Sequence, residues 1–493
     1  MGDASFQIGS SSPAGLPSLN PTESYWQTSH PVPVAEHRST SSLPSNATVV
    51  IVGTGISGVF AAHEILSQST DIDVLVLEAR TLCSSATGRN GGHLVPIIHE
   101  QRPGIIAWEL RNFHHVAALI ESAGIPCDFR KLNGCLGFWN KTYFEEAKAA
   151  LKEAAALAPE QTRDAVRVVE DAAELEELNL VGAVGAIVQT TAASLSPYKL
   201  VTWLWQDLLK KHEGTGRLNL QTTTPVTSLS PHSKEGNPGY LLTTARGTII
   251  ASHIILATNG YTSHLLPQFS SLISPTQAQM TAQLPPPDSP FSSNLIPRSY
   301  GFVGIPGMDH EMSDYLVQRP ISENGATGRG ELMYGGGRHA AKGYGVGVSD
   351  DSYIDPDVEN HLRGLPERLN LAAQGSVRVT HLELLASWTG IIGSSIDGFP
   401  WVGGVPDHHG MFLAAGYSGH GMPNAPLSGR HVARLVLESL RNGGDWSGLQ
   451  KAEVELTEKK GLSSAIDSDA VEKNFGVPVE YVITKERING ALG

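Results

Sequence analysis

Cysteine is scarce in this sequence. The 493 residues include three, Cys83, Cys127 and Cys135, and none of them forms a CxxC pair. An odd, widely spaced set of this size excludes a disulfide framework and offers no pattern typical of a zinc site. We therefore expect no metal site in this protein.

Positive charge is also in short supply. Lysine and arginine total 35 against 49 aspartates and glutamates, which gives a formal net charge of −14. A surplus of negative charge repels the phosphate backbone of nucleic acids, so the composition argues against a nucleic-acid partner. The expected ligand is a small molecule.

Uninterrupted apolar runs of membrane-spanning length are missing. The longest apolar stretch, residues 49–66, is broken by three glycines, His63 and Glu64, and no charged flank follows it. We therefore predict a buried strand and the start of a helix, with no membrane span.

The first 46 residues are rich in serine and proline and have no positively charged region followed by an apolar one, so they are not a secretory signal. We predict a cytoplasmic protein in which residues 1–46 form a flexible arm. The aromatic pair Tyr25 and Trp26 could instead dock on the body of the protein.

The best-defined pattern is a βαβ unit at the start of the body. It consists of a strand at 48–52, a glycine turn, a helix at 56–68 and a strand at 74–78. The turn has the spacing GxGxxG. In a dinucleotide-binding fold, Gly53 allows the tight turn, Gly55 lets a pyrophosphate approach the backbone, and Gly58 lets the helix pack on the strand.

Two further features of this unit suit a nucleotide. The helix N-terminus at Ile56 and Ser57 offers free N–H groups and a partial positive charge to phosphates. Glu78 stands at the end of the second strand, where its carboxylate would accept hydrogen bonds from ribose hydroxyls. These features do not decide between NAD and FAD.

The loop at 83–93 is dominated by small residues and ends in Gly88-Arg89-Asn90-Gly91-Gly92-His93. Such a loop can pass under a flat ring system while its N–H groups face phosphate and flavin oxygens. A mobile surface loop is the alternative interpretation.

Together with the βαβ unit, this loop resembles the D-amino-acid-oxidase-type FAD-dependent oxidoreductases, in the branch with gamma-glutamylputrescine oxidase, glycine oxidase and sarcosine oxidase. The segments at 388–393, 397–403 and 416–422 resemble the C-terminal flavin-binding region of that family in content and order. The similarity covers roughly residues 45 to 445. It implies that FAD is the cofactor.

The resemblance implies a set of FAD contacts. The adenosine half is expected near Glu78, the isoalloxazine near the 88–93 loop, and the flavin's pyrimidine end near the last helix. The cofactor-binding residues predicted in this way are Gly53, Gly55, Ile56, Ser57, Gly58, Glu78, Ala79, Arg80, Thr87, Gly88, Arg89, Asn90, Gly91, Gly92, His93, Val226, Ala257, Thr258, Gly260, Gly390, Ile391, Gly393, Asp397, Gly419, His420, Gly421 and Met422.

The expected fold class is α/β, with a Rossmann-type FAD-binding domain and an interleaved, mainly antiparallel β substrate domain. Strand candidates of the second domain lie at 300–305, 315–318, 332–335 and 377–385. The predicted division is an FAD-binding domain of residues 47–100, 195–268 and 385–445, a substrate domain of residues 101–194 and 269–384, and a C-terminal extension of residues 446–493.

Residues that contact the substrate are harder to select. The candidates for the catalytic face are Tyr261, Arg319, Tyr334, Trp388 and Tyr417. Each of them alone is more often a core aromatic or a solvated arginine. Arg319 ends a strand and could grip a substrate carboxylate with its two-pronged guanidinium.

The predicted reaction is oxidation of an amine or amino acid, with hydride transfer from the α-carbon to flavin N5, hydrolysis of the imine and reduction of molecular oxygen to hydrogen peroxide. Two alternatives stay open. One is a dehydrogenase that passes electrons to a carrier or quinone, and the other is a flavin-binding interaction protein without turnover.

Two details bear on these alternatives. Where the sarcosine-oxidase group has a lysine above the flavin, this sequence has Met333, although Arg338, His339 or Lys342 could supply charge nearby. The segment in which that group attaches its flavin to a cysteine, residues 386–397 here, contains no cysteine. We therefore predict non-covalent FAD, with attachment to His93 as the alternative.

Overall fold

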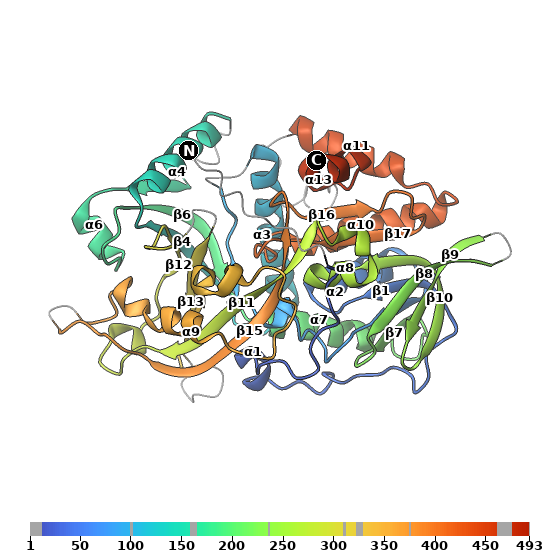
Figure 1. The fold of residues 1–493 in the computed structure, drawn as a ribbon, viewed down its shortest axis with the longest axis horizontal. Helices are drawn as coiled ribbons and strands as arrows, with labels where there is room; N and C mark the ends of the chain where they lie inside the picture. The colour runs from blue at the N-terminus through green and yellow to red at the C-terminus, as the bar shows by residue number, and fades with distance from the viewer. Residues whose placement is uncertain are drawn as a thin grey trace.

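The computed structural model describes residues 12–98, 102–157, 165–234, 237–308, 312–321, 329–373, 376–460 and 476–492. Residues 1–11 of the predicted arm and residues 461–475 of the predicted C-terminal extension lie outside the described residues. Two sheets occupy opposite ends of the long axis of the molecule (Figure 1).

The predicted βαβ unit is confirmed, and it forms the centre of the first sheet. β1 runs over Asn46–Val52, α2 over Ile56–Gln68 and β2 over Val74–Leu77, and β1 and β2 are parallel. Among the described residues this sheet has eight strands in the main order β16-β17-β10-β1-β2-β7, with β9 paired to β10 and β8 paired to β9. The remaining strands are β7 (Leu218–Gln221), β8 (Val226–Lys234), β9 (Asn237–Thr244), β10 (Gly247–Leu256), β16 (Trp401–Gly404) and β17 (Met411–Ala415).

Alternate side chains of β1 enter two different cores. Val49 and Ile51 pack in a cluster with residues of α2, α7 (Pro197–Lys211) and α10 (Ala425–Arg441). Val50 faces the opposite side, in a cluster with residues of β8, β9 and β10. A strand that is covered on both faces has apolar residues at nearly every position, and this pattern allowed β1 to be predicted from the sequence.

The second sheet carries the opposite end of the molecule. Its described strands are mainly antiparallel, in the main order β15-β11-β14-β13-β12-β4-β6-β3, with β5 paired to β6 and a parallel pair between β12 and β4. The expected fold class is therefore confirmed. The strands are β3 (His93–Leu94), β4 (Arg130–Phe138), β5 (Val166–Val169), β6 (Gly185–Ser194), β11 (Ile273–Leu284), β12 (Arg298–Val303), β13 (Ser313–Gln318), β14 (Leu332–Gly336) and β15 (Glu383–Ser395).

The prediction of a strand at 377–385 is wrong. The strand begins at Glu383, runs to Ser395 and pairs antiparallel with β11, so the segment at 388–393 is part of the second sheet. The glycines of this strand let other segments approach closely. A Cβ on Gly390 would lie 3.0 Å from the Cβ of Arg89. The domain boundaries themselves stay predictions.

The sequence also predicts helices at 105–122, 143–158 and 197–211, and the long helices begin and end close to these bounds. α3 spans Pro103–Ala123, α4 spans Lys141–Leu157, and α7 starts at Pro197 behind Ser196, whose side chain accepts a hydrogen bond from the Lys199 N–H. Within the described ranges, no helix has the length and apolar character needed to cross a membrane.

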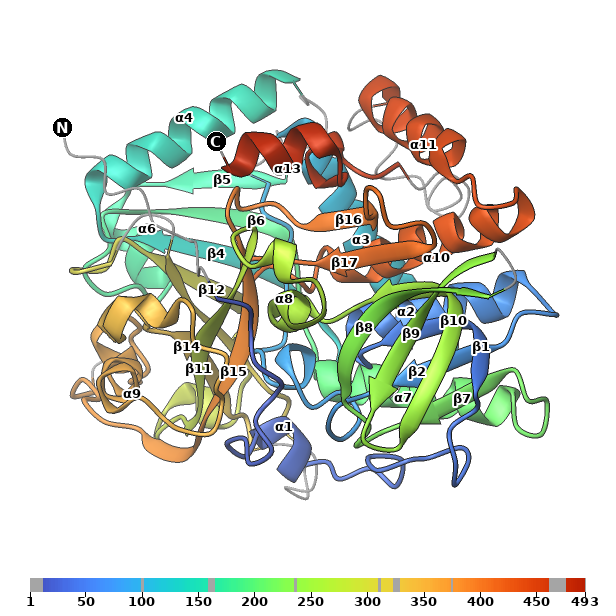
Figure 2. The same ribbon diagram turned by 45° about the vertical axis from the view of Figure 1, so that its right-hand side comes forward.

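The flexible arm requires correction from Ser12 onward. Residues 12–46 run along the body, and a short helix, α1 (Tyr25–Thr28), docks through Trp26, which is 2% exposed (Figure 2). The indole Nε1 donates a hydrogen bond to the Asn90 carbonyl at 2.5 Å. The serine- and proline-rich composition suggested disorder, but the aromatic pair supplies enough apolar surface to hold the segment in place.

Candidate functional site

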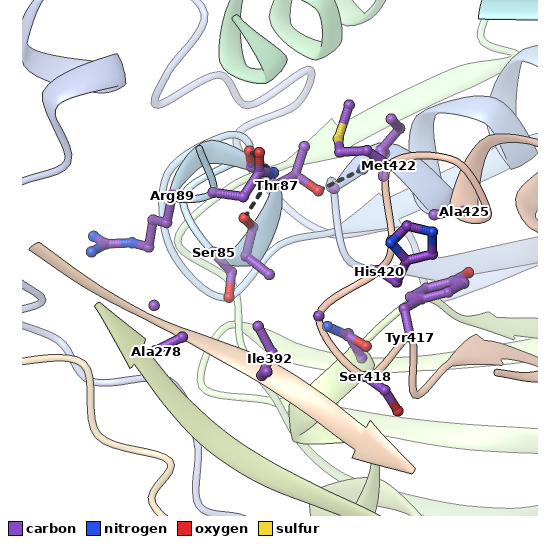
Figure 3. Close-up of a pocket in the computed structure, with 18 of the residues that line it drawn as sticks. Ser85, Thr87, Arg89, Ala278, Ile392, Tyr417, Ser418, His420, Met422 and Ala425 are labelled. Atoms are coloured by element: carbon purple, nitrogen blue, oxygen red, sulfur yellow. Dashed lines mark hydrogen bonds between the residues drawn. The ribbon is translucent and has the colours of Figure 1, made fainter. Parts of the chain in front are cut away.

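A cavity of about 520 Å³ opens where the carboxyl ends of the parallel strands meet the second sheet. This is the position at which doubly wound sheets bind their ligands. Twenty of the predicted site residues line it, namely Gly53, Gly55, Ile56, Ser57, Glu78, Ala79, Thr87, Arg89, Asn90, His93, Val226, Ala257, Thr258, Tyr261, Gly390, Tyr417, Gly419, His420, Gly421 and Met422. Figure 3 shows Tyr417, His420 and Met422 on one side, with Ser85 and Thr87 opposite.

The glycine turn has the geometry that a pyrophosphate requires. Gly53 has φ +109°, and a Cβ there would lie 2.6 Å from the Ala257 carbonyl oxygen. A Cβ on Gly58 would lie 2.1 Å from the Gly53 carbonyl, so Gly58 serves helix packing and does not line the cavity. Gly55 precedes α2, and Gly55, Ile56 and Ser57 line the cavity. The Ile56 N–H donates to Thr87 Oγ1 at 3.1 Å, so Thr87 occupies one of the N–H groups at the start of the helix.

Glu78 is held at the end of β2. The N–H and hydroxyl of Thr54 donate to its Oε2 at 2.9 and 2.6 Å, and the Arg80 N–H donates to Oε1 at 3.0 Å. A carboxylate accepts about four hydrogen bonds, so one acceptor position is left for a ribose hydroxyl. The Arg80 side chain turns away from the cavity and pairs with Asp351 at 3.0 Å.

The glycines of the 88–92 loop act through packing. A Cβ added to Gly88 would lie 2.0 Å from the carbonyl oxygen of Cys83. A Cβ added to Gly91 would lie 2.4 Å from the Tyr315 ring, and one added to Gly92 would lie 2.2 Å from the carbonyl oxygen of Leu195. These three residues do not line the cavity, and neither do Gly260, Ile391, Gly393 and Asp397. The loop therefore fits between its neighbours because it has no side chains at these points.

Arg89 ties the loop to the second sheet. Its Nε donates to the Ser84 carbonyl and its NH1 to the Thr389 carbonyl, both at 2.7 Å. Burial lowers the pKa of this guanidinium to about 10, which still leaves it charged at neutral pH. Its position between the two sheets makes it an orienting group for the loop.

Two histidines and Tyr417 stand at the end of the cavity predicted for the flavin. The hydroxyls of Tyr417 and Ser57 are 2.8 Å apart, and burial raises the pKa of Tyr417. His420 Nε2 lies 3.0 Å from Oε2 of Glu109, which is itself 1% exposed. Burial and the neighbouring His420 lower the pKa of His93 to about 3, so His93 is neutral at physiological pH.

Three of the predicted substrate contacts do not line the cavity. Arg319 lies within 3.7 Å of Asp128 and Glu331 and stacks over the rings of Tyr25 and Trp26. We therefore withdraw it as the carboxylate-binding group. It lies at the end of a strand, as predicted, but buried acidic partners hold it there.

The other two are core aromatics. Tyr334 is fully buried and donates to Asp314 Oδ2 at 2.8 Å, and Trp388 donates from Nε1 to the Arg89 carbonyl at 2.8 Å. Both side chains have their polar atoms satisfied within the protein, so neither is available to a substrate.

Sequence reasoning missed most of the wall formed by the second sheet. This wall includes Ser299, Tyr300, Met308, Met312, Tyr315 and Arg338. Arg338 follows β14 and had been named only as a possible charge near the flavin. Burial lowers the pKa of Arg338 to about 10, so it is a cation at neutral pH. The others carried no motif, because the face of a strand that meets the cavity depends on pairing register.

Glu109 also went unnoticed. It lies on α3 and accepts hydrogen bonds from the Ile97 N–H at 2.8 Å and from Asn424 Nδ2 at 2.9 Å, besides its contact with His420. A glutamate in the middle of an apolar helix was the signal in the sequence that could have identified it.

Asp314, His339 and His361 have possible ligand atoms within 4.8 Å of one another. Asp314 Oδ2 already accepts hydrogen bonds from Tyr334 and His361, the latter at 2.6 Å, and Arg368 contacts the second nitrogen of His361 at 3.3 Å. These bonds account for the cluster, and a nearby guanidinium disfavours a cation. We assign no metal to it.

Residues 48–435 match the sequence family described as DAO, FAD dependent oxidoreductase. The chain belongs to this family of FAD-dependent oxidoreductases. Its residues fit FAD, because the glycine turn, the start of α2 and Glu78 lie along one cavity. They would hold the pyrophosphate at the turn and the ribose at Glu78.

Known relatives agree with this fold. A stretch of 73 residues is 38% identical to glycine oxidase of Geobacillus kaustophilus, which is 15% of this chain and 19% of that relative. The crystal structure of glycine oxidase from Geobacillus kaustophilus superposes with TM-score 0.63 at 19% identity, over 82% of this chain and 98% of the other. The structure of L-amino acid deaminase from Proteus vulgaris superposes with a TM-score of 0.60 at 16% identity, over 82% of this chain and 92% of the other. The structure of FAD-bound L-alpha-glycerophosphate oxidase from Mycoplasma pneumoniae superposes with a TM-score of 0.60 at 15% identity, over 80% of this chain and 95% of the other.

Acid precipitation of the purified protein is expected to leave FAD in the supernatant. Cys83 and Cys135 line the cavity, but burial raises the pKa of both thiols, to about 12 for Cys135, and a protonated thiol is a poor nucleophile. A yellow pellet would contradict this prediction. In that case the variant His93→Ala would show whether the bond is to that residue, because its pellet would be colourless.

Proposed function

We propose that this protein oxidises a carbon–nitrogen bond of a small amine that carries a carboxylate, an amino acid or N-substituted amino acid. The observation that supports this is the wall formed by the second sheet, where the cationic Arg338 accompanies Tyr300, Tyr315, Met308 and Met312. On this wall a guanidinium stands among apolar and aromatic side chains, which suits a ligand with an anionic group and an apolar part.

The hydride acceptor would be supplied by FAD when bound. The α-carbon would lose a hydride as the nitrogen lone pair forms the C=N bond, and water would hydrolyse the imine to a carbonyl compound and an amine or ammonia. The chain's own residues bind and orient the substrate. Arg338 would fix the carboxylate, and the aromatic walls would exclude water around the reacting carbon. No general base is needed when the amine binds in its neutral form.

The test is reduction of the bound flavin by a substrate panel in the absence of oxygen. The panel contains D- and L-amino acids, N-methyl amino acids, polyamines and glycerol 3-phosphate. Bleaching by an amino compound with release of a carbonyl product supports the proposal. Bleaching by glycerol 3-phosphate alone would overturn it, since that substrate loses hydride from a carbon–oxygen centre.

We also propose molecular oxygen as the electron acceptor, giving hydrogen peroxide, with reoxidation slower than in the sarcosine-oxidase group. Met333 is fully buried, and among the described residues that line the cavity there is no lysine. The positive charge that would stabilise developing superoxide is therefore left to the guanidinium groups of Arg89 and Arg338. This observation favours the dehydrogenase as second candidate.

Stopped-flow mixing of the substrate-reduced protein with aerated buffer checks this prediction. Reoxidation within seconds is expected, with hydrogen peroxide formed in a one-to-one ratio to the flavin. If the flavin stays bleached for minutes while an artificial acceptor restores it at once, the dehydrogenase replaces the oxidase.

A further inference from the structure

A segment outside every flavin motif forms part of the cavity wall. Gly15, Leu16 and Pro17 line the cavity, next to Tyr261 and His264. Figure 2 shows this blue segment running along the junction of the two sheets, from near α8 (Thr262–Leu265) towards α1. It therefore covers the cavity at the side where β10 ends.

The near end of the segment is fixed to α8. The Ala14 N–H donates to Ser263 Oγ at 2.9 Å, and the Ala14 carbonyl lies 3.3 Å from Nδ1 of His264. Ala14 is 6% exposed. These contacts place the backbone of the next three residues across the cavity edge.

The far end is fixed to the loop predicted to lie under the flavin. Ser24 Oγ donates to the Gly88 carbonyl at 2.6 Å, and Trp26 donates to the Asn90 carbonyl. A Cβ on Gly92 would lie 3.3 Å from the Trp26 ring, so the indole fills the space beside that glycine. The segment thus donates hydrogen bonds to two carbonyl groups of the loop, which would otherwise need other donors.

The middle of the segment joins both sheets. Thr22 Oγ1 accepts hydrogen bonds from Arg89 NH1 at 3.2 Å and from the Thr389 N–H at 2.9 Å. The Thr22 N–H donates to the carbonyl of Asp351, whose carboxylate pairs with Arg80. One threonine therefore connects the flavin loop, β15 and a buried ion pair.

We propose that residues 14–26 form a retention element for FAD, which closes over the bound dinucleotide and sets the rate at which it leaves. The segment has no sheet pairing to hold it and is attached through separate hydrogen bonds and one buried indole. Segments of this kind open at lower free energy than a sheet does. FAD can then leave when the segment lifts, without unfolding of either sheet.

The test measures FAD release from holoprotein diluted to nanomolar concentration, followed by the rise of FAD fluorescence. Deletion of residues 2–21 removes the wall and keeps Trp26. It is expected to raise the dissociation rate at least tenfold, with the melting temperature of the apoprotein nearly unchanged. Deletion of residues 2–11 is the matched control, since it removes none of these contacts, and its rate should equal that of the full chain.

A measurement on the full chain avoids any problem of folding in the variant. Amide hydrogen exchange of residues 14–26 should be at least tenfold slower in the holoprotein than in the apoprotein, while exchange in β4 stays the same. Equal exchange with and without FAD, or a dissociation rate within twofold of the full chain after deletion of residues 2–21, would overturn the proposal. A protein that retains FAD but oxidises no amine would contradict the proposed function alone.

Discussion

Replacing Gly55 by leucine is expected to abolish retention of FAD. The backbone at Gly55 stands where the pyrophosphate approaches the helix N-terminus, and even a Cβ there would lie 3.1 Å from Thr87 Oγ1. A leucine side chain extends further into the cavity. We expect a rise in the dissociation constant of at least about 100-fold, which corresponds to about 2.7 kcal/mol.

The measurement is the FAD-to-protein ratio after gel filtration, with titration of the apoprotein by FAD. Gly448→Leu is the matched control, because Gly448 is exposed on α11 (Ser447–Lys460) and a Cβ there meets nothing within 4 Å. It should retain FAD fully. A yellow, stoichiometrically loaded Gly55→Leu protein would mean that the glycine turn has been misinterpreted.

Arg338→Met is expected to lower kcat/KM for a carboxylate-bearing substrate by about 10- to 100-fold, mostly through KM. A charge-assisted hydrogen bond contributes about 1.5–3 kcal/mol, and methionine keeps much of the volume of the arginine stem. For the same substrate esterified at the carboxylate, the variant and the parent protein should differ little. This difference between two substrates separates loss of a specific contact from general damage to the cavity.

Arg363→Met provides the control for removal of an arginine. Arg363 is about half exposed on α9 (Pro356–Arg363) and pairs with Glu359 along the same helix. Steady-state kinetics of both variants should be compared at one pH, with FAD content measured in each. If both substrates lose activity equally in Arg338→Met, then Arg338 does not bind the carboxylate.

The sequence predicted the nucleotide half of the site well, because that half depends on short-range pattern. The glycine turn, the start of α2 at Ile56 and the end of β2 beside Glu78 lie within one βαβ unit, so their spacing fixes their geometry. The strand at 48–52 and the helices at 56–68 and 197–211 could be assigned for the same reason.

The substrate half depends on pairing between distant strands, which spacing along the chain does not determine. Arg319 and Arg338 stand on either side of β14, one before it and one after it, and residue type alone does not distinguish them. Asp128 and Glu331 form ion pairs with Arg319, whereas Arg338 lines the cavity. The role of Gly390 in β15 also depends on a distant part of the sequence, because this glycine allows close approach of Arg89.

The order of strands in the first sheet bears on how the protein is made. β1 emerges early from the ribosome, but its neighbour β10 comes about halfway along the chain, and β10 in turn pairs with β17 near the end. Tyr481 emerges later still and donates to Asn424, which hydrogen-bonds with Glu109, the partner of His420. We therefore expect the cofactor site to be complete only after β17 has been made. A chain that stops before β17 lacks the lining residues Tyr417, Gly419, His420, Gly421 and Met422, and we expect it not to retain FAD.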